Sequence, residues 1–350
     1  MSQIKDNTMS DIYSQNPKLF TITNANGMSV TIMDWGATLV SIKVPLNDNT
    51  VRETLLGVKD VENWCSQTCY FNATIGRYAN RIANSKFIVK DQEYILNSGS
   101  QHCLHGGIEG FDKRRFSVIS QEDNAICFAL HSPDGDQGFP GNFDLVVNYS
   151  VADDNSLLVK YIGKCDKECP ACITNHAYFN LNGYNSSILN HTLKLNATKF
   201  LELDDSAIPT SKILDVKDNS AFDFTKEKTI GLDFLNHEQM ITARGYDHPY
   251  LNEDLATKPC AKVTSDDGKL SLELTTDYPA FQFYTGNYIH ANGDIIARDD
   301  NKPYANQSGL CLEPEYYPDC VHMKEFASVN KNVDENHPLE KFICYKFIAN

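Results

Sequence analysis

The stretch TITNANGMSVTIMDWGATLVSIKVPLNDN, residues 21 to 49, consists of short apolar or alternating runs that are broken by turn residues. Within it, Val30, Thr31 and Ile32 follow the period of two that places successive side chains on opposite faces of a strand. Runs of this kind, bounded by Gly, Asn, Asp and Pro, predict antiparallel strands joined by hairpins.

The same pattern continues along the chain to about Leu312. Few windows keep apolar residues three and four positions apart, and the best helix candidate is the short acid-rich piece from Ile230 to Ile241. We find no internal repeat, no low-complexity tract and no linker. We therefore predict an all-β fold, a large antiparallel sandwich with few short helices, as a single domain over residues 1–350. The other runs that support this prediction are FIVKDQEYIL (87–96), AICFALHSPDGDQGFPGNFDLVVNYSV (125–151), SLLVKYIG (156–163) and KLSLELTTDYPAFQFYTGN (269–287).

The composition restricts the kinds of partner. The chain has 350 residues, of which 41% are hydrophobic and 22% charged, so it is globular with a large core. Its 31 Lys and Arg against 46 Asp and Glu give a formal net charge of −15, which repels nucleic-acid phosphates and anionic lipid. No segment has the apolar length of a signal peptide or a membrane span, so we expect a cytoplasmic protein. The expected partner is a neutral small molecule, with no nucleic acid and no membrane; the choice between a monomer and a homodimer stays open.

The eleven cysteines are too sparse for a disulfide scaffold, and we expect mostly reduced thiols. Cys165, Cys169 and Cys172 have a spacing that three-thiolate iron–sulfur sites also use, but they run into an extended β segment without the alternating strands and helices that surround such sites. Two further hypotheses are weak: Cys65 and Cys69 lack a second pair for zinc, and Cys103 near His105 is a spacing that is common by chance. We expect no metal and no cofactor.

The segment ITNHAYFNL, residues 173 to 181, raises the first question about function. Read as a strand, it has one largely apolar face and one polar face that carries Thr174, His176, Tyr178 and Asn180. The segment is too apolar overall to be a surface loop. His176 is therefore either a hydrogen-bonded core residue or part of the wall of a pocket.

A carboxylate stands in a similar position near the C-terminus. Glu313 ends an apolar strand in GLCLEPEYYPD (309–319), and we expect Pro314 to stop the strand directly after it. If such a carboxylate is partly desolvated in a cleft, its pKa rises and it becomes a useful base. Other polar groups that we single out are Arg77, Asn80, Arg81 and Asn84 in GRYANRIANSKF (76–87), His105 in LHGG (104–107), Asp247, expected in a turn, in GYDHPY (245–250), and Gln282 in PAFQFYTGN (279–287).

Each of these residues alone is more often structural than catalytic, and the turn-rich loop SPDGDQGFPGN (132–142) is best explained as a structural connection. As a set, amide, guanidinium, imidazole and carboxylate groups on the strands of a β protein are typical of the walls of a polyol pocket. The sequence therefore favours a site for a sugar.

The motifs together resemble the aldose 1-epimerase family, and the match runs in order over most of the chain. The resemblance implies a β-supersandwich of around 30 strands and an enzyme, an isomerase without cofactors, that interconverts the α- and β-anomers of aldohexoses such as galactose and glucose. It implies His176 as the general acid on the ring oxygen and Glu313 as the general base on the C1 hydroxyl. It also implies that sugar hydroxyls are held, or the catalytic pair is oriented, by Asn80, Arg81, His105, Asp247 and Gln282. The matching motifs are MDWGATLVSIKVP (33–45), GRYANRIANSKF, LHGG with GFDKRRF (110–116), DGDQGFPGN (134–142), TNHAYFNL (174–181), GYDHPY, QFYTGN (282–287) and CLEPEYYPD (311–319).

The chain departs from the family pattern near its end. Pro314 stands where small or hydroxylated residues are usual, and the segment 321–347 lacks the usual proline-glycine stretch before the final strand. Two alternatives stay open: another reaction on a similar β architecture, such as a hexose 6-phosphate epimerase or a glycoside-processing enzyme, and a non-catalytic sugar-binding protein. A phosphate site would need added cations, a hydrolase usually needs two catalytic carboxylates, and a binding protein would not need both His176 and Glu313.

Overall fold

Antiparallel strands dominate the structure, a computed structural model that describes residues 16–290, 295–329 and 332–350. Every pairing between two of its named strands is antiparallel, as the alternating sequence runs predict. Twenty-six strands are named in the described residues, against two short α-helices and several 3₁₀ turns. The prediction of an all-β sandwich with few short helices is confirmed.

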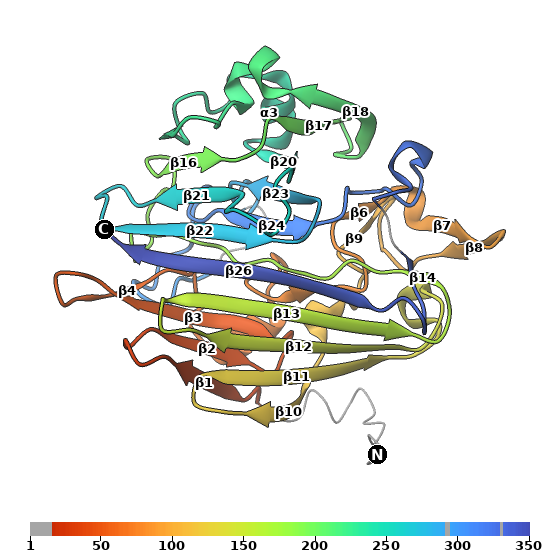
Figure 1. The fold of residues 1–350 in the computed structure, drawn as a ribbon, viewed down its shortest axis with the longest axis horizontal. Helices are drawn as coiled ribbons and strands as arrows, with labels where there is room; N and C mark the ends of the chain where they lie inside the picture. Colours follow the sequence, from red (N-terminus) through yellow and green to blue (C-terminus); the bar gives the residue numbers. More distant parts are fainter. Residues whose placement is uncertain (1–15, 291–294, 330–331) are drawn as a thin grey trace.

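The largest sheet has nine strands, and Figure 1 shows most of them one above the other across the molecule. The C-terminal strand lies in its middle, paired on one side with β13 (Ser156–Cys165) and on the other with β22 (Leu270–Thr276). The first half of the chain is thereby joined to the second. In spatial order the strands are β10 (Ser117–Gln121), β11 (Ala125–Ser132), β12 (Phe143–Val151), β13 (Ser156–Cys165), β26 (Leu339–Ala349), β22 (Leu270–Thr276), β21 (Ala261–Thr264), β16 (Thr192–Leu195) and β19 (Lys228–Thr229).

Two smaller sheets complete the main framework. The N-terminal one contains the stretch that predicts the fold, and it joins β1 (Leu19–Thr23), β2 (Ser29–Met33), β3 (Thr38–Pro45) and β4 (Val51–Glu53). The other has five strands, in the order β18 (Pro209–Asp215), β17 (Lys199–Leu203), β20 (Asp247–Leu251), β23 (Ala280–Tyr284) and β24 (Cys311–Glu315). Short two-stranded pairs are β5 (Thr74–Ile75) with β15 (Thr174–Asn175), β6 (Arg81–Ile82) with β9 (Cys103–Leu104), β7 (Lys86–Val89) with β8 (Gln92–Ile95), and β14 (Cys169–Pro170) with β25 (Asn332–Val333).

The helices are shorter than the sequence predicts. In place of a helix from Ile230 to Ile241, α3 spans only Glu238–Ala243, because the preceding residues form turns and His237 caps the helix by accepting a hydrogen bond from the backbone of Gln239. The other helix, α2, spans Val61–Ser66. Among the residues that the structure describes, no helix is long and apolar enough to cross a membrane.

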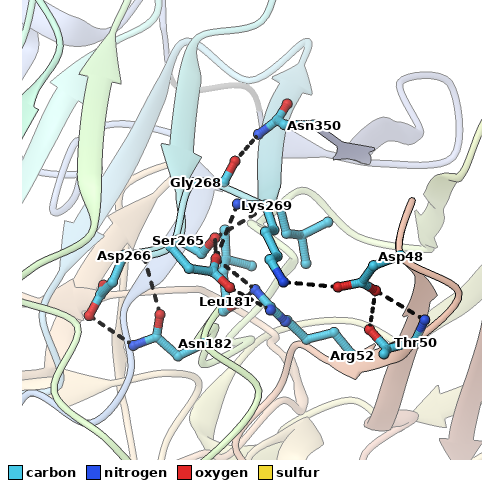
Figure 2. A network of polar contacts seen from close by, with 12 residues as sticks. Asp48, Thr50, Arg52, Leu181, Asn182, Ser265, Asp266, Gly268, Lys269 and Asn350 are labelled. Carbon is cyan, nitrogen blue, oxygen red and sulfur yellow. Dashed lines mark hydrogen bonds and ion pairs between the residues drawn. The ribbon is translucent and has the colours of Figure 1, made fainter.

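A buried hydrophobic core runs through the molecule from Ile22 in β1 to Phe347 in β26. A polar network links the N-terminal sheet to the largest sheet (Figure 2). Arg52 of β4 donates two hydrogen bonds to Asp267, at 3.0 and 2.7 Å, and Lys269 forms an ion pair of 2.9 Å with Asp48. Asp266 and Asn182 bond to each other in the same network. The turn between β21 and β22 is thus tied to the N-terminal sheet.

Candidate active site

The edge strand β24 supplies one wall of the site. Side chains on one face of a strand recur every second residue, so Cys311, Glu313 and Glu315 project to the same side. Glu313 lies opposite Gln282 of the neighbouring strand β23. The prediction that Pro314 stops the strand is wrong: it pairs with Phe281 and β24 continues to Glu315, because an edge strand tolerates a residue without a backbone N–H.

His176 reaches β24 from a segment that is less regular than the sequence predicts. Only Thr174 and Asn175 of the stretch 173–181 form a strand, and both predicted faces are buried. The segment is held instead by single backbone contacts, in which His176 N–H donates to the carbonyl of Ala73 at 3.0 Å. A reciprocal pair between Phe179 and Leu310, at 2.8 and 2.9 Å, then fastens the segment to the start of β24. The polar side chains of the segment have different surroundings. His176 and Tyr178 belong to the site, whereas the Asn180 amide donates to the backbone carbonyls of Ser186 and Ser308.

The centre of the site is a cluster of two imidazoles and one carboxylate. Nε2 of His176 lies 3.5 Å from Oε2 of Glu313. The rings of His105 and His176 meet edge to face with centroids 5.3 Å apart. Tyr178 stacks on the His176 ring at 4.9 Å, and Tyr70 packs against both histidine rings. The aromatic rings therefore pack both imidazoles in place, with one nitrogen of each ring and a Glu313 oxygen all within 4.8 Å of one another.

His105 has a defined protonation pattern. It lies at the end of β9, which pairs with β6, and its Nδ1 accepts a hydrogen bond of 3.1 Å from the backbone N–H of Asn80. Because Nδ1 is the acceptor, the neutral ring carries its proton on Nε2. The Asn80 side chain donates to Oε1 of Glu315 at 2.9 Å, so β6 is linked to β24 through this amide. His105 thus presents a hydrogen-bond donor to a ligand.

Burial controls the ionisation of the central groups. Desolvation lowers the pKa of His176 to about 4 and lowers that of His105 well below its usual value. Desolvation, followed by the nearby charges of Glu315 and Asp247, raises the pKa of Glu313 well above its usual value. Desolvation also raises the pKa of Glu315. The site therefore favours the uncharged forms of both histidine and carboxylic acid.

The second wall comes from β20 and β23. Asp247, predicted in a turn, is instead the first residue of β20, and its Oδ1 accepts a hydrogen bond of 2.6 Å from the side-chain amide of Gln282. Among the residues that the structure describes, the buried Oε1 of Gln282 has no hydrogen-bond partner, so it can accept from a ligand hydroxyl. A pocket of about 340 Å³ opens beside these groups; its wall includes Arg81, Asp247, Tyr288, the loop 204–207 and residues of α3.

The central groups are buried, and each keeps only a small exposed fraction of its surface. These fractions are 4% for Glu313, 5% for His176 and Gln282, 6% for Asn80 and 8% for His105.

The structure brings together the two residues predicted to be catalytic and the five predicted to bind substrate. The positive charge of Arg81 lowers the pKa values of Asp247, Glu315 and His105. Arg81 therefore lies close to the other site residues. Arg77 is different: it is buried and donates to Ser132, Pro140 and Gly141, so it holds the loop 132–142 as a structural connection.

Metal-binding hypotheses receive little support. Ligating atoms of His105, His176 and Glu313 lie within 4.8 Å of one another. A metal on Nε2 of His105, however, would move the ring proton to Nδ1 and break the bond from Asn80. Of the cysteines of the iron–sulfur hypothesis, Cys165 hydrogen-bonds to Cys169 and donates to the carbonyl of Pro140, whereas Cys172 instead accepts from the backbone N–H of Tyr316. Burial raises the pKa of Cys103 to about 12, which argues against a nucleophile there.

Sequence reasoning missed Glu315, Cys311 and Tyr70. Cys311 and Glu315 each lie two positions from Glu313, so their side chains share its face of β24. This spacing could have indicated both residues. No local signal marks Tyr70, whose ring reaches the site only through the tertiary fold.

Comparisons with known proteins show what the chain as a whole is similar to. Residues 18–340 match the family model of aldose 1-epimerase. An aldose 1-epimerase from Haemophilus influenzae is 46% identical over 318 residues, covering 89% of this chain and 90% of that protein. A galactose mutarotase from Rattus norvegicus is 34% identical over 307 residues, 86% of each chain. Among solved structures, a GalM/aldose epimerase homologue from C. elegans superposes with a TM-score of 0.85 at 26% identity, covering 95% of this chain and 99% of that one.

These matches define the class of the protein, which is an enzyme of the isomerase type. More narrowly, the chain belongs to the aldose 1-epimerase family.

Proposed function

We propose that the protein interconverts the α- and β-anomers of aldohexoses such as galactose and glucose, with Glu313 as general base and His176 as general acid. The observation that carries the proposal is the contact of 3.5 Å between the His176 imidazole and the Glu313 carboxylate, beside the polar side chains of Gln282 and His105. An acid and a base that lie this close can serve two oxygens of one sugar ring.

The proton balance of this pair fits mutarotation. Glu313 takes the proton from the C1 hydroxyl while His176 gives a proton to the ring oxygen; the bond from C1 to the ring oxygen breaks and a C1 carbonyl forms. Rotation about C1–C2 and closure on the other carbonyl face give the other anomer. Ring opening thus converts a carboxylate and an imidazolium into a carboxylic acid and a neutral imidazole. Burial favours this second state, since it raises the pKa of Glu313 and lowers that of His176.

The remaining polar groups bind and orient the substrate in this proposal. His105 donates from Nε2, Gln282 accepts at its unpartnered oxygen, and Asp247, Arg81 and Asn80 contact further hydroxyls. Three carboxyl groups against one guanidinium suit a neutral sugar better than a phosphosugar. We also propose that residues 1–350 form one domain. The nine-stranded sheet supports this proposal, because it contains strands from both halves of the chain.

The first test is polarimetry of freshly dissolved α-D-galactose, and separately of glucose, with the purified protein. We expect acceleration to the usual final rotation, and a loss of at least about 10²-fold in His176→Asn and in Glu313→Gln, the scale of positioned proton transfer. The matched controls are His131→Asn and Glu122→Gln at exposed positions. Full activity in either site variant, with a native circular dichroism spectrum, would contradict the assignment.

A further inference from the structure

The two ring nitrogens of His176 face different partners. Nε2 faces Glu313, whereas Nδ1 lies 3.4 Å from Sγ of Cys311, at the start of β24. Both residues are buried, Cys311 completely and His176 to 5% exposure. The thiol contact is therefore shielded from water.

A thiol is an unusual partner for Nδ1 in this molecule. His131, His191, His322 and His337 all have an aspartate oxygen on Nδ1, at distances from 2.6 to 3.0 Å. In His322 the bond to Asp319 raises the pKa. His176 lacks such a carboxylate and its pKa is lowered to about 4.

The groups around the thiol keep it neutral. Desolvation and the charges of Glu313 and Asp247 raise the pKa of Cys311 well above its usual value. The neighbouring thiol of Cys69 raises this pKa further. Tyr284 lies opposite Cys311 on β23 and is itself held protonated by burial. Cys311 therefore offers His176 a sulfur acceptor without a negative charge.

We propose that Cys311 is a positioning residue whose Sγ accepts the Nδ1–H of His176 and holds that proton in place. With Nδ1 occupied, Nε2 is the nitrogen that gives its proton to the sugar ring oxygen and takes it back on closure. An aspartate would fix the same tautomer but would also make the imidazolium a weaker acid, as it does at His322. The neutral sulfur fixes the tautomer and leaves the acid strong. The inference rests on the proposed role of His176.

The test compares Cys311→Ala with Cys311→Ser, in which a hydroxyl can still accept from Nδ1. We expect kcat for α-D-galactose to fall about tenfold in Cys311→Ala with little change in KM, since a net hydrogen bond is lost at a group that reacts, and to recover most of the way in Cys311→Ser. Cys260→Ala is the control for loss of packing, because Cys260 is also buried but donates to the carbonyl of Leu274 and not to His176. Unchanged kcat in Cys311→Ala, or equal losses in the alanine and serine variants, would overturn the inference.

Nitrogen-15 NMR of histidine-labelled protein supplies a readout that does not depend on activity. The neutral His176 ring is expected to carry its proton on Nδ1 in the wild type and to populate both tautomers in Cys311→Ala. A wild-type ring protonated on Nε2 would overturn the inference. If the wild type shows the expected tautomer but does not accelerate mutarotation, the proposed function fails while the structural contact stands.

Discussion

Glu315 acts on Glu313 from two residues away on the same strand face. After burial itself, its charge is the largest cause of the raised pKa of Glu313. In the proposed mechanism the pair of Glu313 and His176 must hold one proton. It gains a second proton as the pH falls through about 4, the pKa of His176, and loses its only proton as the pH rises through the pKa of Glu313.

We therefore predict that Glu315→Gln moves the alkaline limb of the kcat/KM profile to lower pH. Removing a negative charge near Glu313 makes its ionised form less costly, so its pKa falls and the pair loses its proton earlier. The measurement is polarimetry over a range of pH, with the exposed substitution Glu122→Gln as control. An alkaline limb that stays in place or moves to higher pH would contradict the role given to Glu315.

At the level of elements, the backbones of Gly106 and Gly76 lie very close together, next to the paired strands β6 and β9. Gly106 follows His105 with a φ of +90°, and a Cβ at Gly106 would lie 2.0 Å from the carbonyl oxygen of Gly76. No side chain fits between these two backbones. The positions of His105 and Asn80 in the site therefore depend on a glycine that touches neither catalytic residue.

Gly106→Ala is predicted to lower the free energy of unfolding by at least about 3 kcal/mol and to reduce activity, because backbone must move to admit the methyl group. Gly135→Ala is the matched control: Gly135 has a similar φ of +84° but open space around its Cβ position, so only the left-handed backbone cost of about 1–2 kcal/mol applies. Urea unfolding of both variants measures the difference. Equal losses in the two variants would show that the contact with Gly76 is unimportant.

For the whole molecule, the site is a source of instability at alkaline pH. The fold buries Glu313, Glu315 and Asp247, and burial raises the pKa of each above the value in an unfolded chain. The folded state then binds more protons than the unfolded state between the two pKa values, so the free energy of unfolding falls as the pH rises above about 4.5. The polar site thus lowers stability where the enzyme is expected to work.

Glu313→Gln is accordingly predicted to be more stable than the wild type at pH 8, by about 1–3 kcal/mol, the usual size of effects at buried polar groups. The gain should disappear near pH 3, well below the pKa of a glutamate in the unfolded chain, because Glu313 is then protonated in both states. Urea unfolding at the two pH values measures it, with Glu93→Gln in an exposed ion pair as control. The variant would at the same time lose the proposed base, so a stable but inactive protein is the expected result.

Local sequence patterns determined a large part of this protein. Period-two runs and turn residues are properties of neighbouring residues, and they indicated antiparallel sheets and the absence of long helices. The same patterns were less reliable where pairing is irregular, as in the segment 173–181 and around Pro314, because single backbone contacts and edge strands leave no periodic signal. The motifs marked His176 and Glu313 as residues of interest through their chemical type and surroundings.

Only the tertiary structure decided which groups meet. Cys311 and His176 are 135 positions apart, and their contact depends on the pairing of Phe179 with Leu310 and of β24 with β23. The lowered pKa of His176 and the raised pKa of Glu313 follow from burial, which is a property of the packed core and of no single segment. Short-range patterns specify the faces of strands, whereas long-range packing specifies their neighbours, and a site built across strands requires both.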